Sequence, residues 1–237
     1  MGGLIGITLE EKEQGITLLG RIRNEGNLTL SQCRNVTVGG VIGDINLSMP
    51  SMQADTRLEN AGIISVEWAK GAGAYRSSVG GVLGECSVNS ACKMEHLYNT
   101  GDLLLNTWNA PIDLNVGGVA GSMELLDGWF LQVTDAHNKA RIEIKGELAN
   151  KQSAIGGVFG SFAHCVFHCV TNSGEIILPA GYKATVGGLL GDENMLARNS
   201  YLYSCCKDYV GEYPIWNVDE KSVTSKRVIC DKNHKTR

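Results

Sequence analysis

A short apolar phrase, Val-Gly-Gly-Val/Leu-x-Gly, recurs along the chain at nearly regular intervals. Its copies begin at Val38, Val79, Val116, Ile155 and Val186, and Met1 to Gly6 resembles the end of one more copy. The first glycines of the phrase are residues 2, 39, 80, 117, 156 and 187, so the intervals are 37, 41, 37, 39 and 31 residues. A fixed phrase that returns at this spacing indicates a repeat architecture built from stacked units.

A second phrase, Asn-x-Gly, lies between the glycine phrases. It begins at Asn24, Asn60, Asn99 and Asn172, and Asn138-Lys139-Ala140 occupies the same place in the remaining unit. A short alternating apolar run, such as Ile63 to Val66, follows each copy. The two phrases keep in step along the chain, which indicates one repeated unit whose length varies only in its loops.

Each unit contains three short runs that resemble strands: the glycine phrase, the run before Asn-x-Gly and the run after it. Aliphatic residues fill these runs, and Gly, Asn, Asp and Ser separate them. Helical periodicity is weak throughout, with Met52 to Asn60 as the best helical candidate. Such a unit cannot bury its apolar face alone, but stacked units can pair equivalent strands in parallel. We therefore expect an all-β solenoid, a right-handed parallel β-helix of about five repeats of 31–41 residues.

The two phrases are expected to form the corners of each unit. Asn and Gly tolerate a left-handed backbone, and stacked Asn side chains can hydrogen-bond along the solenoid axis. The paired glycines of the other phrase indicate a second corner or a close backbone approach.

The repeat pattern divides the chain into an array, residues 1–205, and a segment without the phrases, residues 206–237, which we interpret as a cap or a linker. The first phrase is cut at its left edge. We expect the chain to be a piece of a longer protein with any export signal upstream.

The alternation of a Cys-x-Asn-x-Gly-like phrase with Val-Gly-Gly-Val/Leu-x-Gly resembles the GLUG motif over about residues 1–191. This motif occurs in repeat regions of bacterial surface and secreted proteins, including adhesins and immunoglobulin A-cleaving metallopeptidases. Ala140 and the long insertions after Gly84 and Gly160 depart from the family pattern. The resemblance implies a building unit located outside the cell or at its surface, and no catalytic site.

Composition excludes some function classes. The net charge is −4 and no basic patch is evident, so we expect no nucleic-acid partner. No apolar run approaches the roughly 18 residues that span a bilayer, so we expect no membrane insertion in this segment.

The segment from His164 to Cys169 carries two His and two Cys, the residue types that bind zinc. On a regular strand His164 and His168 would face one side, and Cys165 and Cys169 the other, so one strand cannot direct all four at one metal. Cys92, Leu131 and Cys165 each lie seven residues before an Asn of the second phrase. An apolar Leu between two Cys favours a column of core residues, and we expect no metal site there.

Other candidates concern cysteines and carboxylates. The spacing of the eight cysteines is irregular, and disulfides between Cys86 and Cys92, or between Cys205 and either Cys206 or Cys230, stay open. Acidic residues follow three glycine phrases and serines follow the other two: Asp44, Glu85 and Asp192, with Ser122 and Ser161. Such a row can bind calcium, but its interruption by Ser favours a solvated corner.

Catalytic motifs are absent: there is no His-Glu-x-x-His, no Gly-x-Ser-x-Gly and no phosphate loop. Gly71 to Arg76 matches only half of a dinucleotide-binding fingerprint. We expect no catalytic, cofactor-binding or metal-binding residues. The glycosylation sequons at Asn27, Asn35 and Asn46 are attributed to chance. Candidate binding residues are the tryptophans in or beside loops, Trp68, Trp108 and Trp129, and Trp216 in the C-terminal tail, although a role as lids over local apolar patches is favoured.

The sequence therefore favours a non-catalytic extracellular repeat region that acts as an adhesive or spacer module, with a host glycan or a protein as ligand. One alternative is the repeat portion of a larger secreted metallopeptidase whose catalytic domain lies elsewhere. Another is a polysaccharide-active β-helix enzyme.

Overall fold

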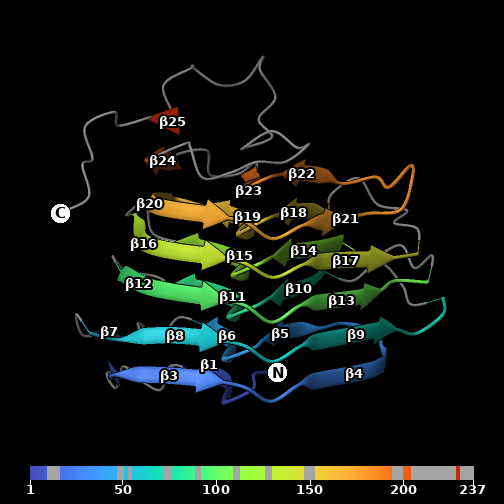
Figure 1. Cartoon of the computed structure of the whole chain (residues 1–237), viewed down its shortest axis with the longest axis horizontal. Helices are drawn as coiled ribbons and strands as arrows, with labels where there is room; N and C mark the ends of the chain where they lie inside the picture. The colour runs from blue at the N-terminus through green and yellow to red at the C-terminus, as the bar shows by residue number, and fades with distance from the viewer. Residues whose placement is uncertain are drawn as a thin grey trace.

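The computed structural model describes residues 1–9, 17–46, 51–52, 55–71, 76–88, 92–108, 113–125, 130–146, 153–193, 200–203 and 228–229. Within these ranges the chain is all-β and its strands pair in parallel with the strands of the next coil, which confirms the β-solenoid (Figure 1). Met52 ends strand β7 (Ser51–Met52) and residues 57–60 form strand β8 (Arg57–Asn60), so the weak helical candidate from Met52 to Asn60 is not helical where the structure describes it.

Four long sheets run along the solenoid, and we number them in the order in which one coil visits them. Sheet 1 contains β3 (Arg21–Asn24), β8 (Arg57–Asn60), β12 (Cys92–Asn99), β16 (Leu131–Asn138), β20 (Cys165–Asn172), β24 (Tyr201–Tyr203) and β25 (Val228–Ile229). Sheet 2 contains β4 (Leu28–Cys33), β9 (Ile64–Trp68), β13 (Leu103–Asn106), β17 (Ile142–Lys145) and β21 (Ile176–Ile177).

Sheet 3 contains β5 (Thr37–Gly39), β10 (Arg76–Gly80), β14 (Asp113–Gly117), β18 (Ala154–Gly156) and β22 (Thr185–Gly187). Sheet 4 contains β1 (Ile5–Leu9), β6 (Ile42–Asn46), β11 (Leu83–Val88), β15 (Ala120–Leu125), β19 (Phe159–Ala163) and β23 (Leu190–Glu193). A short pair, β2 (Thr17–Leu18) with β7, lies beside them.

The glycine phrase contributes two strands rather than the single strand expected from the sequence. Its first residues end a strand of sheet 3, the second glycine and the next residue turn, and its last residues begin a strand of sheet 4. Each coil therefore has four strands where we expected three. The phrase is also a corner, as the paired glycines indicated.

The interior of the solenoid consists of two separate apolar cores. One lies between sheets 1 and 4 and includes Leu97, Leu83 and Phe159. The other lies between sheets 2 and 3 and includes Ile64, Leu103 and Val116. Figure 1 shows these pairs of sheets side by side, sheets 1 and 4 to the left and sheets 2 and 3 to the right. The chain thus folds as two parallel lobes that share every coil.

The two phrases meet between these lobes. A Cβ atom placed on Gly81 would lie 2.3 Å from Cγ of Asn99, and Nδ2 of Asn172 donates a hydrogen bond of 3.1 Å to the carbonyl of Gly188. The second glycine therefore leaves room for the Asn side chain that crosses the coil. This contact pinches the cross-section into its two lobes.

The Asn side chains form the predicted ladder along the axis. Nδ2 of each Asn donates to Oδ1 of the Asn in the next coil, at 2.8 Å from Asn24 to Asn60, 2.9 Å to Asn99, 3.0 Å to Asn138 and 3.0 Å to Asn172. Each Asn also bonds the backbone two residues further on, as in Nδ2 of Asn99 to the Gly101 carbonyl at 3.1 Å. An otherwise costly row of buried amides is thereby satisfied within itself.

The expected left-handed backbone at this corner is wrong. None of the described residues with a positive φ belongs to an Asn-x-Gly phrase. The glycine is favoured instead by close approach, because a Cβ on Gly62 would lie 2.0 Å from the Gly26 carbonyl oxygen of the preceding coil. Within the eight-residue strands of sheet 1 the left-handed residues lie earlier, at His96, Asp135 and Cys169, and we call each of these backbone kinks a bulge. The handedness of the solenoid stays a prediction.

Candidate functional site

The outer face of sheet 1, close to the Asn corner, carries a connected group of polar side chains. Residues one position before each Asn stack in register: Arg23, Glu59, Tyr98, His137 and Thr171. Because Asn faces inward and the strand alternates, this preceding residue faces outward. Stacking of the coils therefore assembles one continuous surface from residues that lie 34 to 39 positions apart.

Bulges bring a second set of side chains to the same surface. His96 and Asp135 have φ angles of 57° and 59°, and neither belongs to a register pair, whereas Glu95 pairs with Thr134 and Leu97 with Ala136. The strands stay in one-to-one register through this position, because the bulges of successive coils stack on one another. Within each strand the additional outward residue changes which of the following positions face the core, and both side chains lie outside the core.

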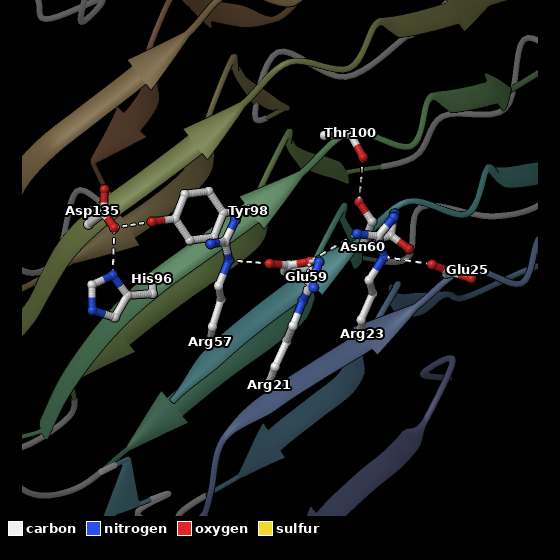
Figure 2. Close-up of polar contacts among 10 residues, drawn as sticks. All are labelled: Arg21, Arg23, Glu25, Arg57, Glu59, Asn60, His96, Tyr98, Thr100 and Asp135. Atoms are coloured by element: carbon white, nitrogen blue, oxygen red, sulfur yellow. Dashed lines mark hydrogen bonds and ion pairs between the residues drawn. The ribbon is translucent and has the colours of Figure 1, made fainter. Parts of the chain in front are cut away.

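Three arginines surround one carboxylate at the first coils of this surface. Arg21 donates to Oε2 of Glu59 from Nη2 at 2.6 Å and from Nε at 3.0 Å, and Nη1 of Arg23 donates to the same oxygen at 3.3 Å (Figure 2). Arg57 forms an ion pair with Oε1. The Glu59 side chain is only 7% exposed, whereas those of the arginines are 39–58% exposed.

The charge state of Glu59 follows from these contacts. Burial acts to raise its pKa, but the hydrogen bond from Arg21 and the nearby charges of Arg57 and Arg23 outweigh burial, so the pKa lies below its usual value. Glu59 is therefore ionised at neutral pH, and it orients three guanidinium groups at the surface.

A second cluster centres on Asp135. His96 Nδ1 lies 2.6 Å from Oδ2, His137 Nε2 lies 2.5 Å from Oδ1, and the Tyr98 hydroxyl also donates to Oδ2 (Figure 2 shows the His96 and Tyr98 contacts). Burial acts to raise the pKa of Asp135, but the hydrogen bonds from Tyr98, His96 and His137 lower it below its usual value. Burial and the contact with Asp135 raise the pKa of Tyr98, so its hydroxyl stays protonated.

The clusters are joined by ring contacts. The Tyr98 ring lies 4.1 Å from the guanidinium carbon of Arg57 and stacks on His137 at a centroid distance of 5.3 Å. His137 Nδ1 in turn contacts the hydroxyl of Thr171. A depression lies beside this array, lined by Arg21, Arg23, Arg57, Glu59, Asn60, Ala61, Tyr98, Asn99, Thr100, His137 and Lys139. We call it the corner depression.

Asp135, His137 and Thr171 place a carboxylate, an imidazole and a hydroxyl in series, an order that can activate a nucleophile. His137 and Thr171 nevertheless lie in register-paired stretches of their strands, where backbone N–H groups take part in the parallel ladder. Stabilisation of an oxyanion requires N–H groups that point at the reacting atom. The geometry of the series accounts for proton transfer between side chains and shows no group that would stabilise an oxyanion among these three described residues.

The sequence candidates are placed elsewhere. Cys92, Leu131 and Cys165 pair in register and are buried, which confirms the core column. The expected facing of the His164 to Cys169 segment is wrong in part: Cys165 is buried and Cys169 is exposed, because the bulge at Cys169 shifts the phase. Among the described residues, no group of three or more His, Cys, Asp or Glu is placed to hold a metal ion.

The open question of a Cys86–Cys92 disulfide is resolved, because Cys86 is a buried thiol. Burial raises the pKa of Cys86 well above its usual value, and raises that of Cys92 to about 11. Both are therefore poor nucleophiles. Cys205, Cys206 and Cys230 lie outside the described residues.

The residues that follow the glycine phrases do form the expected row, because each is the register partner of the next across sheet 4: Asp44, Glu85, Ser122, Ser161 and Asp192. Its expected position at a solvated corner is wrong: these residues lie within strands, and none of them is fully exposed. Burial and the charge of Glu85 raise the pKa of Asp44.

The two described tryptophans, Trp68 and Trp108, differ in their surroundings. Trp68 is fully buried at the end of β9, with Nε1 3.3 Å from the Ser77 hydroxyl. Trp108 is 39% exposed, donates to Glu67 at 2.8 Å and lies 4.5 Å from the Lys70 ammonium. Trp129, Trp216 and residues 72–75 of the Gly71 to Arg76 segment lie outside the described residues. Asn27 and Asn35 are exposed, and the Asn46 side chain lies outside the described set.

None of the residues of the corner depression was a candidate from the sequence. Aligning the repeats on Asn-x-Gly would have placed Arg23, Glu59, Tyr98 and His137 in one column. Their proximity to Arg57 and Asp135, however, depends on the bulges. In the part of the chain that is described, no helix is long and apolar enough to cross a membrane. Comparison of the chain with protein-family models, curated proteins and solved structures gave no match.

Proposed function

We propose that the chain is a non-catalytic repeat module of a surface or secreted protein, and that it binds a ligand through the corner depression. The observation that carries the proposal is the contrast between the two faces of sheet 1. Its inner face serves the core, whereas its outer face arranges arginine, histidine and tyrosine side chains from successive coils around a depression. Polar and aromatic side chains held on rigid strands are typical of binding surfaces.

The similarity to GLUG arrays supports an extracellular location. Buried cysteines are compatible with that location, because thiols with a raised pKa supply little thiolate for oxidation. The regular stack of parallel strands, linked by the Asn ladder, supports a role as a spacer that presents this surface.

A binding experiment with a turnover control tests the proposal. The chain is applied to an array of glycans and host proteins, and every bound glycan is then incubated with the chain in solution while new reducing ends are measured. We expect binding and no release of fragments. Absence of binding to any class, with the chain folded by circular dichroism, contradicts the adhesive role.

The Asp135–His137–Thr171 series favours one second candidate, the polysaccharide-active enzyme. Cleavage of a glycan that is lost in Asp135→Asn, while binding is retained, would establish that candidate in place of ours. The metallopeptidase interpretation concerns other parts of a longer protein, and the full reading frame tests it through a His-Glu-x-x-His motif.

A further inference from the structure

The corner depression follows the solenoid axis across four successive coils. Its lining comes from β3, β8, β12 and β16 and from the residues directly after the Asn ladder, Ala61, Thr100 and Lys139. The depression lies at the waist of the cross-section, where the Asn side chains cross to the glycine corner. The pinch that separates the two cores therefore also places the depression outside the Asn corner.

The lining is strongly basic although the chain as a whole is acidic. It contains four basic side chains, Arg21, Arg23, Arg57 and Lys139, and a single carboxylate, Glu59, in a chain of net charge −4. Glu59 is nearly buried and its arginine partners are about half exposed, and Arg23 also pairs with the exposed Glu25. The positive charge that remains at the solvent side is therefore that of Arg21, Arg57 and Lys139. Guanidinium groups fixed in this way recognise carboxylate and sulfate oxygens.

Rings accompany the positive charges. Tyr98 lies between the Arg57 guanidinium and the His137 ring, and the residues that follow in the corner are the small or polar Ala61 and Thr100. Sugar rings present both C–H faces and hydroxyl groups. Aromatic rings can pack against the C–H faces of a sugar, and guanidinium groups and small polar side chains can hydrogen-bond its hydroxyl groups.

The axial spacing distinguishes between linear ligands. Neighbouring parallel strands lie about 4.7–4.9 Å apart, so each column along the depression repeats at that distance. This is close to the length of one pyranose unit in an extended polysaccharide. An extended peptide advances about 3.3 Å per residue and falls out of step with the coils.

From these observations we propose that the corner depression binds an acidic polysaccharide that runs along the solenoid axis, about one sugar unit per coil, with its carboxylate or sulfate groups on Arg21, Arg57 and Lys139. The inference rests on the proposed function and names the class of its ligand. Arg57 is held in place by Tyr98 and Glu59, and Arg21 by Glu59. Lys139 is exposed on the far side of the depression.

The test measures equilibrium binding of the whole chain to four probes: polygalacturonate for carboxylates, dextran sulfate for sulfates, unmodified dextran, and a single-stranded oligonucleotide. We expect binding to one or both acidic polysaccharides, none to dextran, and a dissociation constant that increases with salt. Arg57→Gln and Lys139→Glu should each weaken that binding at least tenfold. Lys145→Gln, which removes an exposed lysine of sheet 2 paired with Glu143, is the matched control and should change it less than twofold.

Lys139→Glu keeps the test decisive if Arg57→Gln unfolds the chain, because no described ion pair involves Lys139. Equal loss of affinity in Lys145→Gln, equal binding of dextran, or tighter binding of the oligonucleotide overturns the inference. Binding of dextran alone would overturn it and leave the adhesive function standing. Cleavage of any probe would instead overturn the non-catalytic function.

Discussion

A single side chain in the middle of the Asn ladder makes four hydrogen bonds. Asn99 donates to Asn138 and to the Gly101 carbonyl, and accepts from Asn60 at 2.9 Å and from the Gly101 N–H at 3.2 Å. Every hydrogen-bonding position of this buried amide is used, so its removal leaves buried donors and acceptors without partners.

We expect Asn99→Ala to lower the free energy of unfolding by about 3–5 kcal/mol, because each unsatisfied buried group costs about 1–3 kcal/mol. Asn24→Ala is the matched control at the end of the ladder, where the side chain has a ladder partner on one side only. The decrease in the free energy of unfolding in Asn24→Ala should be about half as large. Urea unfolding followed by circular dichroism measures both variants. Equal decreases would contradict a stabilising contribution from the hydrogen bonds between Asn side chains of successive coils.

Glycine is required for different reasons at two neighbouring positions. A Cβ on Gly118 would lie 2.2 Å from the Gly157 carbonyl oxygen and 2.3 Å from Cγ of Asn138. A Cβ on Gly101 would lie 2.0 Å from the Gly62 carbonyl oxygen, yet Ala140 occupies the equivalent position one coil further on. The coil can therefore move to admit a methyl group in the Asn-x-Gly column.

We expect Gly118→Ala to destabilise the chain by about 3 kcal/mol or more, since it displaces both a backbone and a ladder amide. Gly101→Ala should lower the free energy of unfolding clearly less, because the next coil already has an alanine, Ala140, at the equivalent position. Thermal unfolding of the two variants compares them directly. A larger loss of stability in Gly101→Ala than in Gly118→Ala would show that the glycine corner at Gly118 is packed less tightly than the Asn-x-Gly corner at Gly101.

The carboxylate of Asp135 makes stability depend on pH. Its pKa in the folded state lies below the usual value, so the ionised form stabilises the fold above the pKa of the unfolded chain, about 4, and this contribution is lost as the pH falls through the folded value. Asp135→Asn should therefore be less stable than the parent chain at pH 7, and the difference should shrink below about pH 4. Denaturant titrations at pH 7, 5 and 3 measure it, and a difference that grows towards pH 3 would contradict the assignment.

For the individual strands, the sequence patterns predicted where most strands lie. They did not predict how many strands each coil has, or which side chains face outward after a bulge. The two phrases identified the corners, the parallel register and the Cys92–Leu131–Cys165 column, because each depends only on the repeat interval. The fourth strand of each coil was not predicted, because the glycine phrase is one continuous apolar run in the sequence and does not show the turn that divides it into two strands. The candidate site could not be predicted because the bulges interrupt the two-residue alternation from which the outward-facing side chains of a strand are inferred.

The stacked bulges give a prediction about sheet 1. Cys169 is exposed with a φ of 51°, a conformation that costs a side-chain-bearing residue roughly 1–2 kcal/mol and a β-branched residue more. Cys169→Gly should leave stability unchanged or raise it, and Cys169→Val should lower it by about 1–2 kcal/mol. Val166→Gly, at a regular position of the same strand, is the control and should be destabilising. A stabilising valine at 169 would contradict the bulge.

In the whole molecule, the pinch between the two lobes recurs from coil to coil, and the described strands of each coil pair with those of the neighbouring coils. Stability in such an array is approximately a sum of coil and interface contributions. The coils of β12 to β15 and of β16 to β19 have a described neighbour on both sides, whereas β3 and β4 lie at the first edge of their sheets.

Amide hydrogen exchange should therefore protect the chain in a graded way. Backbone N–H groups of β12, β13, β16 and β17 should exchange most slowly, and those of β3 and β4 should exchange faster, because opening a terminal coil breaks one interface and opening an inner coil breaks two. Asn99→Ala should speed exchange in both lobes of its own coil, since the ladder lies between them. Uniform protection along the axis, or an effect confined to sheet 1, would mean that the two lobes do not unfold as parts of one coil.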